Sequence, residues 1–249
     1  NMSHEFRTPI NIILAITQLL NMHNKSLSDE KYKEYLNILK QNSYRLLRLI
    51  NNVMDITKVN SDSDKLNLVN CNIVSVLEEI VMSTVLYASE KKRNIIFDTD
   101  SEEIILACDE DKIERIMLNL ISNAIKFSQL HTDIEIKIKT NVDLNRVYIS
   151  VKNYGSNIEF KDREKIFERF YRVDNSLNRK NEGCGIGLFL CRKFIEMHGG
   201  EIFLDNIDNG TQFSFYLPIN ITEEKINNPI IQKDSLIEKC NIEFSDIYT

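Results

Sequence analysis

Apolar side chains recur every three or four residues in two stretches near the start of the chain. The first seam consists of Phe6, Ile10, Ile13, Thr17 and Leu20. The second seam consists of Tyr32, Leu36, Leu39, Ser43, Leu46, Ile50, Val53 and Thr57. A period of 3.5 residues is typical of helices that pack along one narrow seam. The polar segment 23–30 between them contains Ser28 and Asp29, both suitable N-caps. The pattern therefore predicts an antiparallel helical hairpin.

Two helices with a single apolar seam cannot bury that seam by themselves. A second copy of the chain would bury it by completing a four-helix bundle, so the pattern favours a homodimer. The alternative is that the hairpin packs on the domain that follows it in the same chain.

Beyond residue 72 the pattern mixes helical and alternating periods. Residues 60–72 have the composition of a linker, and the polar segment 220–249 predicts no secondary structure. Helices are predicted over 73–91, 109–127 and 186–198, and strands over 94–99, 103–107, 134–140, 146–152, 201–205 and 211–217. The predicted fold class is α+β, with the hairpin followed by an α/β sandwich that has helices on one face of a mixed sheet. We expect three parts: the hairpin at 1–62, the sandwich at 70–218 and a polar tail at 219–249.

Charge and cysteine content exclude several classes of protein. The 31 basic and 37 acidic residues give a net charge of −6, and no basic cluster is present, which argues against a nucleic-acid surface. No apolar run approaches the roughly 20 residues that span a bilayer. The five cysteines form no CxxC pair, which favours reduced thiols over a disulfide framework or a zinc site.

Three of the seven glycines lie in one short segment. All seven follow residue 154, and Gly183, Gly185 and Gly187 lie just before or at the start of a predicted helix. Glycines let backbone N–H groups approach an anion, and a helix N-terminus favours negative charge. The loop lacks both the Rossmann pattern and the Gly-Lys-Ser/Thr of a P-loop. It is either a phosphate cradle of another kind or simply a tight turn.

Four side chains share one face of the helix predicted to end at Phe127. Asn119, Asn123, Lys126 and Phe127 are spaced at i, i+4, i+7 and i+8. Amide oxygens can coordinate Mg²⁺, a lysine can neutralise phosphate, and an aromatic ring can cover a base. The alternative is a solvated helix face in a chain rich in asparagine.

The order of four motifs resembles the catalytic core of bacterial two-component sensor histidine kinases. The motifs are HEFRTP at 4–9, NLISNAIKFS at 119–128, IFERFY at 166–171 and the glycine-rich loop at 183–190. They are similar to the H, N, F and G2 boxes of that family, and the resemblance covers residues 1 to about 218. It implies a dimerisation and phosphotransfer hairpin followed by an ATP-binding domain of the Bergerat (GHKL) type.

The resemblance implies roles for three residues of the first helix. His4 would accept the γ-phosphoryl group of ATP, and Glu5 would orient its imidazole and take its proton. Thr8, one turn later, would help place the water that dephosphorylates the partner. That partner would be the receiver domain of a response regulator, which takes the phosphoryl group on an aspartate.

The resemblance also implies a nucleotide site for ATP and Mg²⁺. Asn123 would be the Mg²⁺ ligand, with Asn119 and Lys126 near the phosphates, and Phe127 and Ile158 would flank the adenine. The remaining implied nucleotide-site residues are Asn153, Gly155, Arg169, Gly183, Gly185, Ile186, Gly187, Leu188 and Thr211.

One motif departs from the family. Asn153-Tyr154-Gly155-Ser156-Asn157 stands where the family has Asp-x-Gly-x-Gly. A carboxylate that accepts a charge-assisted bond from adenine is replaced by an amide, which suggests a loss of about 1–2 kcal/mol in binding. Asn157 is the milder change, because asparagine tolerates the left-handed backbone that glycine supplies.

Two hypotheses of different classes follow from that departure. The chain is a working kinase with weakened nucleotide binding, or a degenerate kinase that acts as a dimeric phosphatase or binding module. A nucleic-acid enzyme of the gyrase type is a third, disfavoured because the hairpin with His4 has no place in it. Since the chain starts within a helix just before His4, we expect a sensor region and any membrane anchor upstream, with this part on the cytoplasmic side.

Overall fold

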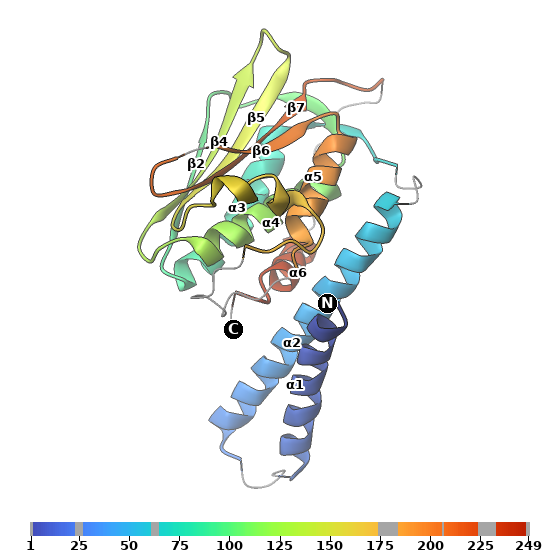
Figure 1. The fold of residues 1–249 in the computed structure, drawn as a ribbon, viewed down its shortest axis with the longest axis vertical. Coiled ribbons are helices and arrows are strands. Elements are labelled where there is room, and N and C mark those ends of the chain that lie inside the picture. Colours follow the sequence, from blue (N-terminus) through green and yellow to red (C-terminus); the bar gives the residue numbers. More distant parts are fainter. Residues whose placement is uncertain are drawn as a thin grey trace.

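The structure is a computed structural model that describes residues 2–22, 27–60, 65–173, 184–205, 207–223 and 233–247. Helices α1 (Met2–Met22) and α2 (Asp29–Asn60) form an antiparallel hairpin that extends below a compact α/β unit (Figure 1). The predicted hairpin is thus confirmed within one chain. No helix in these described ranges has both the length and the apolar character needed to cross a bilayer.

The α/β unit is built on a five-stranded mixed sheet. Its order is β2-β4-β5-β7-β6, with β2 parallel to β4 and all other neighbours antiparallel. The strands are β2 (Asn94–Thr99), β4 (Asp133–Asn141), β5 (Arg146–Tyr154), β6 (Glu201–Asp205) and β7 (Gly210–Pro218). A separate pair, β1 (Val69–Asn72) with β3 (Ile105–Cys108), is antiparallel. The helices are α3 (Ile73–Glu90), α4 (Glu110–Phe127) and α5 (Gly187–Met197), with short 3₁₀ turns η1 (Phe160–Asp162) and η2 (Lys165–Phe167).

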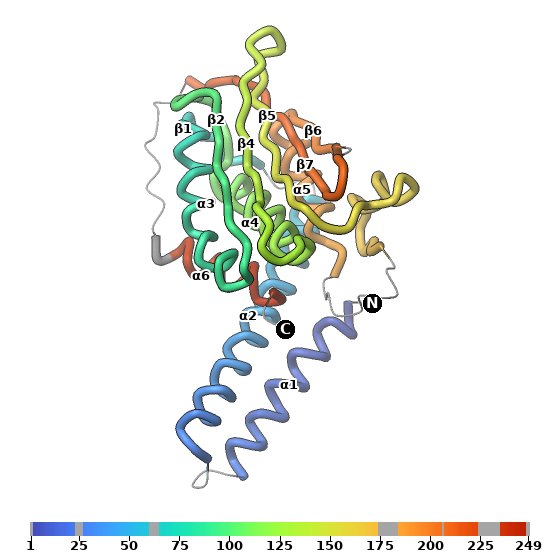
Figure 2. The backbone as a smooth tube through the Cα atoms, turned by 90° about the vertical axis from the view of Figure 1, so that its left-hand side faces the viewer, coloured from blue at the N-terminus to red at the C-terminus, as the bar shows by residue number. Residues whose placement is uncertain are grey.

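The helices cover one face of the sheet because the strands alternate in polarity. In β4, Ile134, Ile136 and Ile138 are buried, whereas Glu135 and Lys137 between them lie on the open face. An antiparallel sheet tolerates this arrangement, with one face on the core and one in water. Figure 2 shows α3 and α4 behind β2 and β4, which confirms the predicted sandwich.

Helix α4 begins where the sequence predicts. The Asp109 carboxylate accepts a hydrogen bond from the Lys112 backbone N–H at 3.2 Å, as an N-cap does. The Asp109 backbone N–H in turn donates to Nε2 of His198, at the C-terminal end of α5, at 3.0 Å. The start of α4 is therefore fixed to the end of α5.

Besides the two 3₁₀ turns, one strand and one helix were not predicted. Strand β1 lies within a stretch that has linker composition, and α6 (Lys233–Glu243) lies in the tail for which no structure was predicted. Both depend on distant partners. Strand β1 has only four residues and pairs with β3, and α6 buries Leu236, Cys240 and Glu243.

Helix α2 buries a different stripe from the predicted seam. Leu49, Asn52 and Ile56 are buried, and α2 contacts α5 and α6 of the α/β unit. By contrast Tyr32 and Ile50 of the predicted seam are more than 40% exposed in the single chain. The alternative that the hairpin packs on its own downstream domain is thus seen for the second half of α2, while dimerisation through the seam stays a prediction.

Candidate functional site

A cavity of about 730 Å³ lies between the hairpin and the α/β unit. It is bordered by α2, by the C-terminal half of α4, by the end of β5 and the residues that follow it to 158, by residues 184–188 before and at the start of α5, and by the start of β7. The predicted nucleotide residues that line it are Asn119, Asn123, Lys126, Phe127, Asn153, Ile158, Gly185, Ile186, Gly187, Leu188 and Thr211. The structure therefore brings most of the predicted site together from four separate segments.

The predicted face of α4 points into this cavity. The Asn123 amide Nδ2 donates to Oδ1 of Asn119 at 3.3 Å, and Oδ1 of Asn123 accepts no hydrogen bond from the described residues. Phe127, at the end of the helix, is 49% exposed at the cavity edge. An amide oxygen of this kind suits Mg²⁺, which takes one or two protein oxygens and completes its shell with phosphates and water. The described part of the chain holds no cluster of three His, Cys, Asp or Glu side chains able to form a metal cage.

Two glycines allow the start of α5 to approach its neighbours closely. Gly185 has a φ of +66°, and a Cβ there would lie 2.6 Å from the backbone oxygen of Tyr171. A Cβ on Gly187 would lie 2.1 Å from Nδ2 of Asn119. Gly187 thus allows the start of α5 to pack closely against α4, and Gly185 allows the residues before α5 to pass close to the backbone of Tyr171. Gly183 lies outside the described residues.

The end of β5 contributes a buried amide. Asn153 is 3% exposed and is paired in the sheet with Thr211 of β7. Its Nδ2 is buried and donates no hydrogen bond to any described residue. A buried donor without an acceptor is costly, so this atom is suited to a ligand that supplies one. The Thr211 hydroxyl is already engaged and donates to the backbone oxygen of Ser156 at 3.2 Å.

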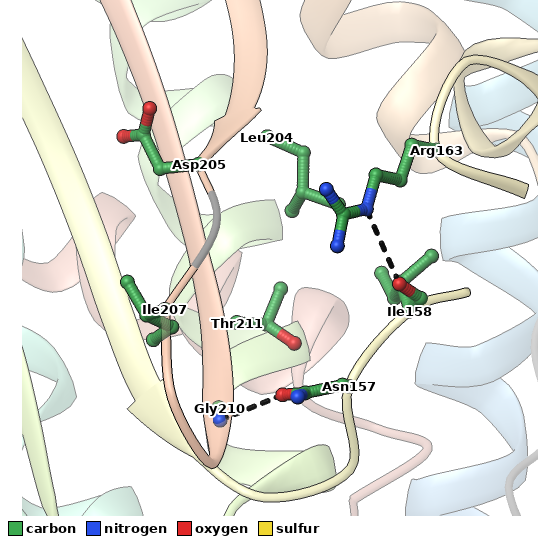
Figure 3. A pocket seen from close by; sticks show the side chains of 8 residues that line it. All are labelled: Asn157, Ile158, Arg163, Leu204, Asp205, Ile207, Gly210 and Thr211. Atoms are coloured by element: carbon green, nitrogen blue, oxygen red, sulfur yellow. Dashed lines mark hydrogen bonds between the residues drawn. The ribbon is translucent and has the colours of Figure 1, made fainter. Parts of the chain in front are cut away.

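Asn157 plays a different part from the one predicted. Its backbone is not in the left-handed region, so the expected substitution for a glycine conformation is wrong. Instead Oδ1 of Asn157 accepts a hydrogen bond from the Gly210 backbone N–H at 2.8 Å (Figure 3). Next to it, Nε of Arg163 donates to the backbone oxygen of Ile158 at 3.3 Å. Side chains therefore fix the loop after β5 against the start of β7.

Two predicted nucleotide residues do not line the cavity. A Cβ on Gly155 would lie 2.0 Å from the backbone oxygen of Phe127, so this glycine permits a close backbone contact. The guanidinium of Arg169 lies 4.5 Å from the centre of the Phe189 ring, away from the cavity lining. In this structure Gly155 packs against the cavity wall at Phe127, and Arg169 packs on Phe189 of α5.

The predicted residues of α1 lie at the cavity edge. Glu5 lines the cavity, and its carboxylate lies 3.9 Å from the Arg172 guanidinium. His4 precedes it on the exposed side of the helix, outside the lining. The Thr8 hydroxyl donates to the backbone oxygen of His4 at 3.2 Å, as threonines in helices often do.

Several cavity residues were missed by the sequence analysis. Arg45, Arg48, Leu49 and Asn52 reach the cavity from α2, and Asp246 reaches it from the turn after α6. The signal for the α2 residues was a second stripe at spacings of three and four, beside the more apolar seam. The signal for the tail was the 4-4-3 spacing of Leu236, Cys240, Phe244 and Ile247, all of which are buried.

Charges are concentrated where the tail meets α2 and α4. Burial raises the pKa of the Asp246 carboxyl, but Arg48 and Lys126 offset this and hold it below its ordinary range. The pKa of Glu243 is likewise lowered, because Arg115 and Arg48 outweigh burial. Burial lowers the pKa of Lys126, an effect that Asp246 only partly offsets. Both carboxylates are therefore held in their charged form.

Comparison with known families decides the identity of the chain. A model described as the His Kinase A (phospho-acceptor) domain matches residues 1–62. A second model, described as the histidine kinase-, DNA gyrase B-, and HSP90-like ATPase, matches residues 108–221. The chain belongs to the sensor histidine kinases. The two matches correspond to the hairpin and to the α/β unit of this histidine kinase core.

Curated sensor kinases are similar to the chain over most of its length. Sensor histidine kinase WalK of Bacillus subtilis (strain 168) is 31% identical over 228 residues, which cover 90% of this chain and 36% of that protein. Sensor protein kinase WalK of Staphylococcus aureus is 29% identical over 225 residues, covering 90% of this chain and 54% of that one. This histidine kinase core thus spans about a third to a half of the length of these relatives.

Solved histidine kinases share the fold. Full-length ShkA in complex with AMPPNP superposes with a TM-score of 0.67 at 26% identity, over 88% of this chain and 45% of that one. Histidine kinase ThkA in complex with the response regulator protein TrrA superposes with a TM-score of 0.64 at 29% identity, over 88% of this chain and 60% of that one. These structures support the arrangement of a helical hairpin followed by a GHKL domain.

Proposed function

We propose that this chain transfers the γ-phosphoryl group of Mg-ATP to His4 and then to an aspartate of a response regulator receiver domain. One observation carries the proposal. Asn119, Asn123 and Lys126 of α4 face the start of α5 across a cavity whose far wall is formed by the hairpin that carries His4. One molecule thus contains both a site that can bind the phosphates of ATP and a histidine that can accept a phosphoryl group.

The cavity has distinct ends for the base and for the phosphates. At the base end, Phe127 and Ile158 offer apolar surface, and Asn153 offers an amide beside Thr211. At the phosphate end, Asn119 and Lys126 supply an amide and an ammonium donor, as recognition of phosphate requires. Asn123 would hold Mg²⁺ through its free amide oxygen. Mg²⁺, when bound, would neutralise charge on the phosphates.

The first helix would supply the acceptor. A ring nitrogen of His4 attacks the γ-phosphorus in line, forming an N–P bond as the bond to ADP breaks. The ring proton passes to Glu5, whose carboxylate lies at the cavity edge. Arg172, beside Glu5, would help to hold that carboxylate in place. Because His4 lies outside the lining, α1 and the α/β unit must move closer together for the transfer.

Partner proteins would use the hairpin. The structure of ThkA with the response regulator TrrA supports a response regulator as the partner that accepts the phosphoryl group. Thr8 would help to place the water that dephosphorylates this partner. Apolar side chains exposed along both helices support a homodimer. These side chains are Ile10, Leu14, Leu19, Met22, Tyr32, Leu36, Leu47, Ile50 and Met54. Burying them against a second copy would complete the four-helix bundle. The location on the cytoplasmic side of a membrane stays a prediction.

The test is incubation with γ-labelled ATP and Mg²⁺. We expect acid-labile, base-stable label on the wild type and none on His4→Gln. The matched control is His131→Gln, because His131 is exposed and far along the chain from the hairpin, and it should label like the wild type. Absence of label on the wild type at millimolar Mg-ATP would contradict the proposal and favour the degenerate module, against which the similarity to WalK argues.

A further inference from the structure

The tail beyond residue 232 is packed into the body of the protein. Leu236, Cys240, Phe244 and Ile247 are all buried. The Phe244 ring packs edge-on against Tyr87 of α3 with centroids 5.0 Å apart. The Tyr87 hydroxyl donates to Oδ1 of Asn241 at 3.0 Å. Apolar and polar contacts therefore hold α6 and the turn after it against α3 and α4.

This packing brings Glu243 to the residues proposed to bind phosphate. Its side chain is 1% exposed and accepts hydrogen bonds from Arg115 at 2.6 Å and from the Asn119 amide at 3.2 Å. Nε of Arg48, on α2, lies 3.2 Å from the same carboxylate. One carboxylate thus contacts α2 and two positions on α4.

Asp246 makes the equivalent contacts one turn later. Its Oδ2 lies 2.6 Å from Nζ of Lys126 and 2.5 Å from a terminal nitrogen of Arg48. Asp246 also lines the cavity itself, beside Lys126. The donors proposed for phosphate, Asn119 and Lys126, are therefore both engaged by carboxylates of the tail.

Carboxylates and phosphates compete for the same donors. Both are oxyanions that accept charge-assisted hydrogen bonds from Lys and Arg. Arg48, Arg115 and Lys126 carry three positive charges, against three negative charges on Glu243, Asp246 and Asp55, whose Oδ2 lies 3.4 Å from Arg115. A nucleotide triphosphate carries more negative charge than one carboxylate, so it can compete with Asp246 for Lys126 and Arg48. A phosphate at Lys126 would also lie within a few ångströms of Asp246 and repel it.

We propose that the tail segment 233–247 is an internal ligand of the phosphate end of the nucleotide cavity, which Mg-ATP must displace in order to bind. The inference rests on the proposed nucleotide site. It adds that the chain regulates this site by competition with its own acidic tail. Because Arg48 belongs to α2, the docked tail also links the hairpin to the α/β unit, and its release removes that link.

The docked tail lowers the apparent affinity for nucleotide in proportion to its occupancy. If the tail is docked in nine molecules of ten, the apparent Kd for Mg-ATP is raised about tenfold. Because the two ligands exclude each other in this scheme, every molecule that has bound Mg-ATP has its tail undocked.

The first experiment measures the Kd of Mg-ATP calorimetrically for full chains. Glu243→Gln with Asp246→Asn keeps the shape of the tail but removes its charges. Phe244→Ala keeps the charges but removes the apolar anchor. We expect each variant to bind Mg-ATP about tenfold more tightly than the wild type. The matched control is Glu223→Gln with Glu238→Gln, which removes the same charge from exposed positions near and on the tail and should leave the Kd unchanged.

The second measurement is hydrogen exchange of the C-terminal peptide, with and without Mg-ATP. The Phe244 and Ile247 amides donate to the Cys240 and Phe244 oxygens, both at 2.9 Å, so a docked tail protects them from exchange. Loss of protection on adding Mg-ATP supports displacement. Equal affinities in all variants, or full protection with nucleotide bound, would overturn it. Failure of every variant to bind nucleotide while the tail stays protected would contradict the proposed nucleotide site, and competition with it.

Discussion

The two ends of the cavity differ in how their polar groups are satisfied. At the phosphate end, Asn119 and Lys126 are engaged by Glu243 and Asp246, which come from the same chain. At the base end, Nδ2 of Asn153 is buried and donates to no described residue. Asn119 and Lys126 are thus paired within the chain, whereas the amide of Asn153 is left for the ligand. The difference has an energetic reason, because burying a charged group such as Lys126 without a partner costs far more free energy than burying an amide without one.

Among the variants at the two ends of the cavity, we expect the largest loss of stability from a substitution of Arg115. Arg115→Met removes the shortest partner of the buried Glu243 carboxylate together with the contacts of Arg115 to Asn52 and Asp55 on α2, and the free energy of unfolding should fall by about 3 kcal/mol. Chemical denaturation of both single variants and the double variant with Glu243→Gln measures this. The double variant should be more stable than the sum of the singles predicts. Additive losses would show that the two side chains do not interact.

At the base end, a substitution of Asn153 should change the affinity for nucleotide. Asn153→Asp should lower the Kd of Mg-ATP by about ten- to thirtyfold, which corresponds to about 1–2 kcal/mol, because a charged acceptor forms a stronger bond to the base. Without nucleotide the same variant should unfold more easily, since the new carboxylate is buried without a partner. Calorimetry measures the first effect and denaturation the second. Asn37→Asp, on the exposed surface of α2, is the control for the added charge.

The loop beside the base end should respond more weakly. Asn157→Ala removes the acceptor for the Gly210 N–H, and we expect a loss of about 1 kcal/mol in stability, with a few-fold weaker binding of nucleotide. Asn157→Asp retains an acceptor and should behave like the wild type. If both variants are equally destabilised, the hydrogen bond is not the cause, and thermal unfolding distinguishes the two cases.

The smallest effect concerns His198, which joins the two helices that frame both ends. Burial lowers its pKa from 6.5, and its Nε2 accepts from the Asp109 N–H, so the folded state favours the neutral ring. Below that pH the unfolded chain binds more protons than the folded one, and stability should fall as the pH is lowered from about 7 to 5. His198→Gln should make this slope shallower, while His131→Gln, at an exposed position, should not. Parallel slopes in all three proteins would contradict this role.

The elements that the sequence predicts correctly are those set by nearby residues, through caps and through the spacing of polar and apolar side chains. Helix α4 has a capping aspartate and a clear polar stripe, so its start, its end and four of its cavity residues follow from spacing alone. The strands β2 and β6 also match their predicted bounds. In these elements local propensity and tertiary packing favour the same structure.

Elements that depend on distant partners escape prediction. Helix α6 buries only one residue per turn, too few to distinguish it from a polar tail until α3 and α4 are in place. Arg48 reads as a surface residue of α2 until Glu243 and Asp246 are placed beside it. The unpaired amide of Asn153 likewise becomes visible only in three dimensions.

The contact at Gly187 ties two sequence motifs into one unit. Because a Cβ there would meet the Asn119 side chain at 2.1 Å, the residue permitted at one position depends on the residue at the other. A chimaera that takes α4 from one kinase and the glycine-rich loop from another therefore risks a clash even if each motif is intact. Exchanges between related kinases should move both segments together, and a larger residue at position 187 becomes tolerable only with a smaller one at position 119.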